Sequence, residues 1–167
     1  MSAPPQLPIE PLTRAAFAPF GTVIEVAGAE RRLINEGTTE RFHALALADV
    51  GADGAAILSL FRASRRHFPF QVCMLERHPL GSQAFYPLTE HDWLVVVAEG
   101  ALQPAPGRMR CFRATGRQGV SYARNTWHHP VLGLQARQDF LVMDRQGPGD
   151  NLEQFRFGDV SQRLISL

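Results

Sequence analysis

Two short polar segments, each set between apolar runs, carry the side chains that could do chemistry. The first contains Glu76 and His78 two residues apart, and Gln83 follows after a turn at Pro79–Gly81. Because alternate side chains of a β-strand share a face, Glu76 and His78 point the same way, and Gln83 can return toward that face from the next strand. The alternative is that Glu76 is solvated and His78 caps the turn, and the spacing alone leaves both open.

The second segment, 122-YARNTWHH-129, ends in two adjacent histidines. Adjacent side chains of a strand face opposite sides, so only one of His128 and His129 can line a site. Tyr122, Asn125 and Trp127 add aromatic and hydrogen-bonding groups beside them. A purely structural histidine is the alternative at this segment.

Together the two segments resemble the two motifs of cupin barrels, His-x-His-x(3,4)-Glu-x(6)-Gly and Pro-x-Gly-x(2)-His. In that alignment Glu76 replaces the first histidine, Gln83 replaces the glutamate and Asn125 replaces the glycine. The second motif then points His128 inward. Glu76, His78, Gln83 and His128 would form the ligand set if a divalent metal is bound, but neutral glutamine is a weak ligand, so tight redox-metal chemistry is not favoured.

A framework of many short strands must position these side chains. Runs rich in Val, Leu and Phe are separated by turn residues, and helical periodicity is scarce beyond a short helix over Arg14–Phe17, capped by Thr13 and stopped by Pro19. This pattern predicts an all-β fold with little helix, a sandwich or a closed barrel. The expected strands are Thr22–Val26, Phe42–Leu47, Ala56–Phe61, Phe70–Glu76, Gln83–Pro87, Trp93–Ala98, Met109–Ala114, Gly119–Tyr122 and Asp139–Met143.

The composition is that of an ordinary globular protein, with 167 residues, 45% hydrophobic and 20% charged. This length predicts one domain over residues 1–167. A net charge of +1 without a basic run argues against nucleic-acid binding, and no apolar stretch reaches the roughly 20 residues that span a bilayer. The N-terminus shows no signal-peptide pattern, which predicts a cytoplasmic location.

All 17 positively charged residues are arginine, since the chain contains no lysine. Schiff-base chemistry by a lysine side chain is therefore excluded, and so is a phosphate-binding P-loop, which leaves no nucleotide cofactor to expect. Cys73 and Cys111 lie far apart in apolar contexts, which predicts two buried, reduced thiols that catalysis does not need. A disulfide or a catalytic cysteine is the alternative.

Four runs resemble the signature blocks of the ureidoglycolate lyase family: 33-LINEGTTERFHALA-46, 75-LERHPLGSQAFYP-87, 119-GVSYARNTWHHP-130 and 139-DFLVMDR-145. Their order and spacing fit the family over roughly residues 7–157, the expected core of the domain. The resemblance implies a cupin-like β-barrel, that is, a double-stranded β-helix or jelly roll, and a homodimer. It also implies cleavage of ureidoglycolate to glyoxylate and urea in allantoin (purine) degradation, and a divalent metal, with nickel as the candidate.

The substrate that this resemblance implies assigns roles to the polar residues. Breaking its C–N bond needs a base for the α-hydroxyl proton and an acid for the leaving urea, roles that fit His78 and His128, with Glu76 as the base if no metal is bound. The substrate carboxylate calls for arginine. The candidate substrate-binding residues are Arg62, Gln83, Asn35, Arg41, Tyr122 and Trp127.

Four alternatives remain at this point. Any one of the arginines can be a solvated surface group, and Asp144 with Arg145 is interpreted as a structural ion pair in preference to a catalytic role. A ureidoglycolate amidohydrolase would share the substrate but release ammonia instead of urea. A non-catalytic cupin sensor would bind a small carboxylate without turning it over.

Overall fold

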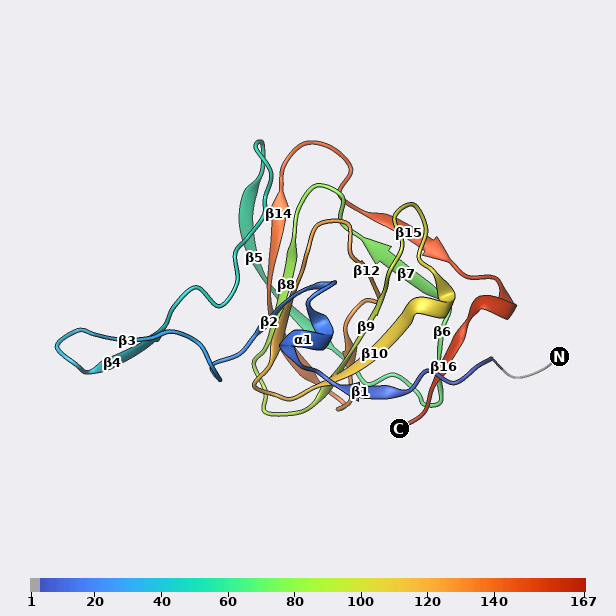
Figure 1. Ribbon diagram of the computed structural model, residues 1–167, viewed down its shortest axis with the longest axis horizontal. Coiled ribbons are helices and arrows are strands. Elements are labelled where there is room, and N and C mark those ends of the chain that lie inside the picture. The colour runs from blue at the N-terminus through green and yellow to red at the C-terminus, as the bar shows by residue number, and fades with distance from the viewer. Residues whose placement is uncertain (1–3) are drawn as a thin grey trace.

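Two facing β-sheets form the body of the protein in a computed structural model that describes residues 4–167 (Figure 1). The larger sheet has the strand order β1 (Ile9–Pro11), β10 (Met109–Ala114), β9 (Trp93–Ala98), β12 (Trp127–His128), β7 (Met74–Arg77) and β15 (Glu153–Arg156), and β13 (Leu132–Gly133) also pairs with β9. The smaller sheet has the order β2 (Gly21–Ile24), β11 (Gly119–Tyr122), β8 (Gln83–Pro87), β14 (Gln138–Gln146) and β5 (Ala55–Ala63). Met1–Ala3 lie outside the described residues. They are the start of the predicted domain and of the N-terminal segment in which no signal-peptide pattern was found.

The chain crosses repeatedly between the two sheets. It runs from β7 in the larger sheet to β8 in the smaller, back to β9 and β10, across to β11, back to β12 and β13, across to β14 and back to β15. This alternation is the jelly-roll arrangement of a double-stranded β-helix. The prediction of an all-β, cupin-like barrel with little helix is therefore confirmed.

Strand β9 lies between two hydrophobic cores, which explains its uninterrupted apolar sequence WLVVVA. Its odd-numbered residues, Trp93, Val95 and Val97, belong to the core between the two sheets. Its even-numbered residues, Leu94, Val96 and Ala98, belong to a second core on the outer face of the larger sheet. The period-two alternation of a strand thus serves both cores.

A smaller pair of strands, β6 (Phe70–Val72) and β16 (Arg163–Ile165), helps to cover the second core. The helical elements are α1 (Arg14–Phe17), η1 (Pro106–Arg108) and η2 (Asp159–Ser161). Thr13 Oγ1 accepts a hydrogen bond from the amide of Ala16, so the predicted cap and helix are both confirmed. Among residues 4–167, no helix has the length and apolar character needed to cross a membrane.

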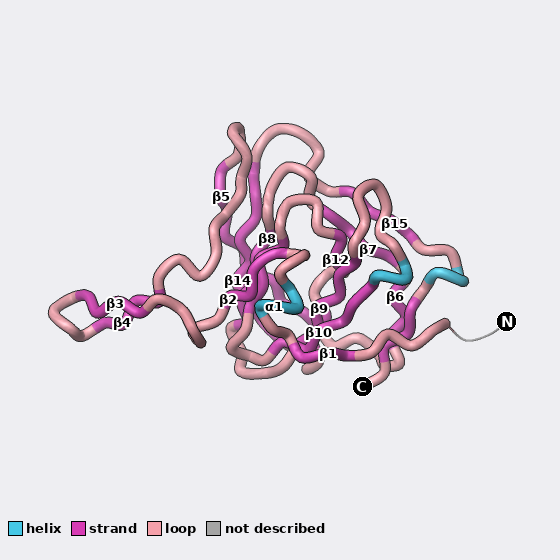
Figure 2. Tube along the Cα trace, in the orientation of Figure 1, coloured by secondary structure: helices cyan, strands magenta, loops and turns pink. Residues whose placement is uncertain are grey.

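A hairpin of β3 (Arg31–Ile34) and β4 (Thr39–Phe42) projects from the body on the side of the smaller sheet (Figure 2). The strand predicted at Phe42–Leu47 is wrong beyond its first residue, because residues 43–47 are a connecting loop. The predicted strand Phe70–Glu76 is divided at Cys73 between β6 and β7, which belong to different sheets. At that break Cys73 is exposed, which corrects its predicted burial, whereas Cys111 is buried and both thiols are free.

Candidate active site

Glu76, His78 and His128 come together between the two sheets, at one end of the barrel. His128 lies directly opposite Glu76 in the β12–β7 pair, and their side chains approach with His128 Nε2 and a Glu76 oxygen 3.8 Å apart. His78 follows the end of β7, and its ring centroid lies 5.2 Å from that of His128. One ligand atom from each of the three residues lies within 4.8 Å of the others. The strand spacing therefore produces a compact histidine–carboxylate cluster.

Backbone carbonyl groups orient both imidazoles of the cluster. His78 Nδ1 lies 2.6 Å from the carbonyl oxygen of Asn151, and His128 Nδ1 lies 2.8 Å from that of Thr126. A carbonyl oxygen only accepts, so each Nδ1 carries the hydrogen and each Nε2 presents a lone pair. Both Nε2 atoms are buried without a hydrogen-bond partner. The two histidines thus direct electron pairs into the same space.

Gln83 and Tyr122 lie beside the cluster on neighbouring strands of the smaller sheet. Gln83 Nε2 donates to Asp144 Oδ1 at 2.6 Å, whereas its Oε1 is buried without a partner. The Tyr122 ring stacks on His128, with the centroids 4.0 Å apart and the planes within 13°. These contacts limit the movement of the His128 ring and add a third unpartnered acceptor to the site.

Burial controls the charges of the cluster. It lowers the pKa of His128 to about 3, although the hydrogen bond to the Thr126 carbonyl acts in the opposite direction, so His128 is neutral near pH 7. Burial also raises the pKa of Glu76, and the nearby Asp144 adds to this rise, whereas His78 and a hydrogen bond from Gln154 oppose it. The pKa of Tyr122 lies far above its ordinary value, again because of burial, so its hydroxyl stays protonated.

The inward-facing atoms form a set that a divalent cation would satisfy. Two imidazole Nε2 atoms, the Glu76 carboxylate and Gln83 Oε1 are all acceptors, and the three from His78, His128 and Gln83 are buried without hydrogen-bond partners. Orphaned buried acceptors are costly, and mixed nitrogen and oxygen donors suit first-row divalent metals. The residues present therefore fit a divalent metal site.

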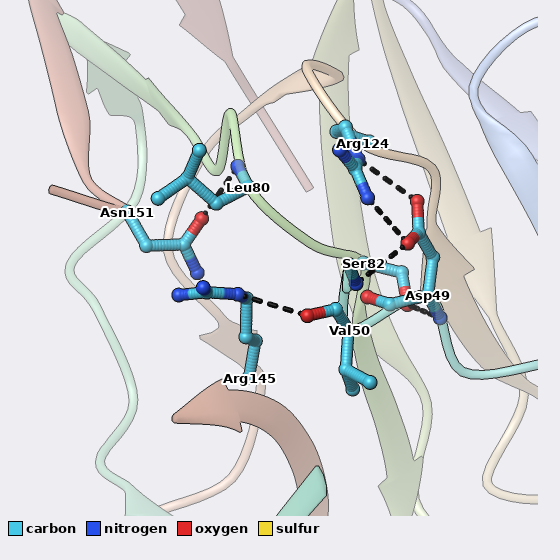
Figure 3. Close-up of polar contacts among 8 residues, drawn as sticks. Asp49, Val50, Leu80, Ser82, Arg124, Arg145 and Asn151 are labelled. Carbon is cyan, nitrogen blue, oxygen red and sulfur yellow. Dashed lines mark hydrogen bonds and ion pairs between the residues drawn. The ribbon is translucent and has the colours of Figure 1, made fainter. Parts of the chain in front are cut away.

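Loops distant in sequence are tied together next to this cluster (Figure 3). The Arg124 guanidinium forms two hydrogen bonds with the Asp49 carboxylate, and Ser82 bonds the backbone of Asp49. The Leu80 amide donates to the Asn151 side chain at 2.8 Å, while the Asn151 backbone carbonyl holds His78. The turn after β7 is thus braced from both sides, which positions His78.

Four of the predicted substrate-binding residues lie elsewhere in this chain. Trp127 faces the second core, on the opposite side of the larger sheet from His128, and the guanidinium of Arg77 lies over its ring at 4.6 Å. Asn35 and Arg41 are exposed in the projecting hairpin. Arg62 forms a bidentate ion pair with Asp139 at the surface. The structure thus unites Glu76, His78, Gln83, Tyr122 and His128, but not these four.

His129 has surroundings quite different from those of His128. Its ring meets Phe70 edge-on at 5.2 Å, and its Nδ1 bonds the Pro130 carbonyl. Burial lowers its pKa to about 4. It is therefore a packed histidine on the side of the larger sheet that faces away from the cluster.

Asp144 and Asn151 are the site residues that sequence reasoning missed. The predicted ion pair of Asp144 with Arg145 is wrong, because Asp144 accepts from Gln83 while Arg145 Nε donates to the Val50 carbonyl. Adjacent side chains on a strand face opposite sides, and this was the signal that could have excluded the pair. Asn151 acts through its backbone, for which the sequence offers no signal.

The fold and the cluster define a small cupin-like enzyme with a histidine–carboxylate centre. The chain belongs to the ureidoglycolate lyase family, whose profile matches residues 4–163. It is 57% identical to a ureidoglycolate lyase of Rhizobium meliloti over 155 residues, covering 92% of this chain and 91% of that protein. It is 53% identical to one of Brucella anthropi and 51% to one of Stutzerimonas stutzeri, each covering 95% of this chain and 94% of the relative.

Among solved structures, a mutant oxalate decarboxylase of Bacillus subtilis aligns with a TM-score of 0.39 and 11% identity, over 70% of this chain and 31% of that one.

Proposed function

We propose that this protein cleaves ureidoglycolate to glyoxylate and urea, a step of allantoin degradation. The observation that carries the proposal is the cluster of His78, His128 and Glu76, with the buried Oε1 of Gln83 on the strand beside it. The family of the chain and the names of its relatives support the same substrate. The acceptor-rich site suits a small polar molecule with several N–H and O–H groups.

The reaction is an elimination at one carbon, which carries a hydroxyl, a carboxylate and the ureido nitrogen. A base removes the hydroxyl proton, the oxygen forms a carbonyl, and the C–N bond breaks. The departing nitrogen takes a proton, so that urea and glyoxylate leave. One proton is removed and one is delivered, and no net proton is consumed.

Without a bound metal, Glu76 and His78 are the groups that we assign to these proton transfers. The raised pKa of Glu76 makes it a stronger base than an exposed carboxylate, and His78 presents an unpartnered Nε2 beside it. His128 stays neutral near pH 7, so it serves as an acceptor or a ligand and not as a proton donor. Tyr122 holds His128 in place by stacking.

If a divalent metal is bound, Glu76, His78, His128 and Gln83 would hold it. When bound, it would polarise the substrate oxygens and lower the pKa of the hydroxyl. Two imidazoles with two oxygen ligands are compatible with nickel, which is the first metal to test.

We propose further that the chain acts as one domain, in the cytoplasm and as a homodimer. Two free thiols support a reducing compartment. The outer face of the smaller sheet exposes Leu58, Leu60 and Leu141, with Leu60 opposite Leu141 in the β5–β14 pair. The β3–β4 hairpin projects on the same side and pairs with no other strand among residues 4–167. An isolated hairpin and a long apolar edge strand are both features that a second copy would cover.

The deciding experiment follows the products of ureidoglycolate with purified protein, after subtraction of the rate without protein. We expect glyoxylate and urea in equal amounts, and a large loss of rate after chelation that added divalent metal restores. Release of ammonia in place of urea would identify an amidohydrolase instead. Binding of a small carboxylate without turnover would identify a sensor.

A further inference from the structure

The side chain of Asp144 lies beside that of Gln83, on the face of the smaller sheet that is turned toward the site. Asp144 is on β14 and Gln83 is on β8, and these two strands are hydrogen-bonded neighbours in the smaller sheet. Gln83 Nε2 donates to Asp144 Oδ1 at 2.6 Å, the short distance typical of a charge-assisted hydrogen bond.

This contact decides which end of the Gln83 amide faces the site. An ionised carboxylate can only accept hydrogen bonds, so it selects the NH₂ end of the amide. The carbonyl end must then point the other way, where Oε1 is buried and has no partner. Without the carboxylate, either end of the amide could face the site. An NH₂ end in that position would direct its partly positive hydrogens at a cation and repel it.

The charge of Asp144 is also not neutralised by its neighbours. Within residues 4–167 it makes no ion pair, and the adjacent Arg145 points away to the Val50 carbonyl. Its charge lies next to the site, because Oδ1 is 2.6 Å from Gln83 Nε2 on the inner face of the smaller sheet. Two carboxylates therefore face two orientation-locked imidazoles and one amide oxygen, an arrangement that attracts a cation.

We propose that Asp144 is a positioning residue that turns Gln83 Oε1 toward the centre of the site and so completes a divalent-metal site with Glu76, His78 and His128. In this role it acts through Gln83, whose amide it orients by the hydrogen bond from Nε2. The inference rests on the proposed function for its biological meaning, but metal binding tests it without turnover. Outer-shell partners of this kind alter metal affinity by about 10- to 100-fold.

The test titrates metal-free protein with Ni²⁺ in a calorimeter, with folding checked by circular dichroism. Asp144→Asn keeps the size of the side chain but removes its charge and its obligatory acceptor character. We expect this variant to bind Ni²⁺ about 10- to 100-fold more weakly than the parent chain. The matched control is Asp92→Asn, which removes a carboxylate from the surface ion pair with Arg113, and it should bind like the parent.

A double variant, Asp144→Asn with Gln83→Glu, separates positioning from general damage. The new amide at position 144 can donate to the new carboxylate at position 83, so donor and acceptor are exchanged within the pair. The net charge is that of the parent chain, and one carboxylate oxygen again faces the site. We expect its Ni²⁺ affinity to return to within a few-fold of the parent or to exceed it.

Three outcomes would overturn the inference: a parent chain that binds no divalent metal, an Asp144→Asn protein within twofold of the parent, or a folded double variant that stays as weak as Asp144→Asn. If metal binding follows the expected order but ureidoglycolate is not turned over, the proposed function fails and the role of Asp144 stands.

Discussion

His128 and His129 are neighbours in the chain, yet they occupy different chemical environments. His128 is 1% exposed, stacks on Tyr122 and points its Nε2 toward Glu76. His129 packs against Phe70 on the other side of the sheet. The same two-residue period that separates them also puts Trp127 in the second core.

We predict that His128→Ala removes most of the turnover, whereas His129→Ala retains it and is mainly less stable. Loss of a group that handles protons or holds a metal typically slows a reaction about 100- to 10,000-fold. Steady-state rates measure the first effect, and urea denaturation measures the second. The reverse ranking in two folded proteins would show that the site lies on the other face of β12.

Strand β2 holds β11, the strand that carries Tyr122, through a close backbone approach. Gly21 pairs with Tyr122 and has a φ of +146°, a conformation that L side chains rarely adopt. A Cβ at Gly21 would lie 2.0 Å from the Ser121 carbonyl oxygen, so the backbone would have to move. Glycine is therefore required here for the two strands to meet.

We predict that Gly21→Ala destabilises the protein by roughly 3 kcal/mol, because it adds both backbone strain and a clash. The free energy of unfolding from urea titration measures this loss. Gly107→Ala is the matched control, since a Cβ there has no neighbour within 4 Å and φ is not positive. Equal stability of the two variants would contradict the structural role of Gly21.

At the scale of the whole molecule, the projecting hairpin and the apolar outer face of the smaller sheet remain without a cover in a single chain. Leu60 is 55% exposed on the edge strand β5, with Leu58 two residues away on the same strand and Leu141 opposite. A two-fold dimer would bury such a face against the same elements of a second copy.

We predict that Leu60→Glu converts the proposed homodimer to a folded monomer, since a carboxylate at a buried interface would be desolvated without a partner. Sedimentation at micromolar concentration measures the mass. Leu102→Glu is the control, because Leu102 is 85% exposed in the loop that follows β9, outside this face. A parent chain that sediments as a monomer would contradict the dimer. A Leu60→Glu protein that is still a dimer would show that the interface lies on another surface.

The sequence by itself determined the local features of this protein. Short runs rich in Val, Leu and Phe, separated by turn residues, predicted strands such as Gln83–Pro87, Trp93–Ala98 and Met109–Ala114 with the bounds that the structure has. The spacing of Glu76 and His78, and the adjacency of His128 and His129, predicted which of them share a face. These features depend on the geometry of one strand, which repeats every two residues whatever the rest of the chain does.

The completion of the site depends on contacts between distant parts of the chain. Asp144 lies 61 residues after Gln83. Asn151, whose carbonyl orients His78, lies 73 residues after His78. The projection of Asn35 and Arg41 away from the cluster likewise depends on the path of the connection between β2 and β5. Such contacts are set by the register of strands within a sheet and by how the two sheets face each other, and a local pattern of polar and apolar residues does not encode either.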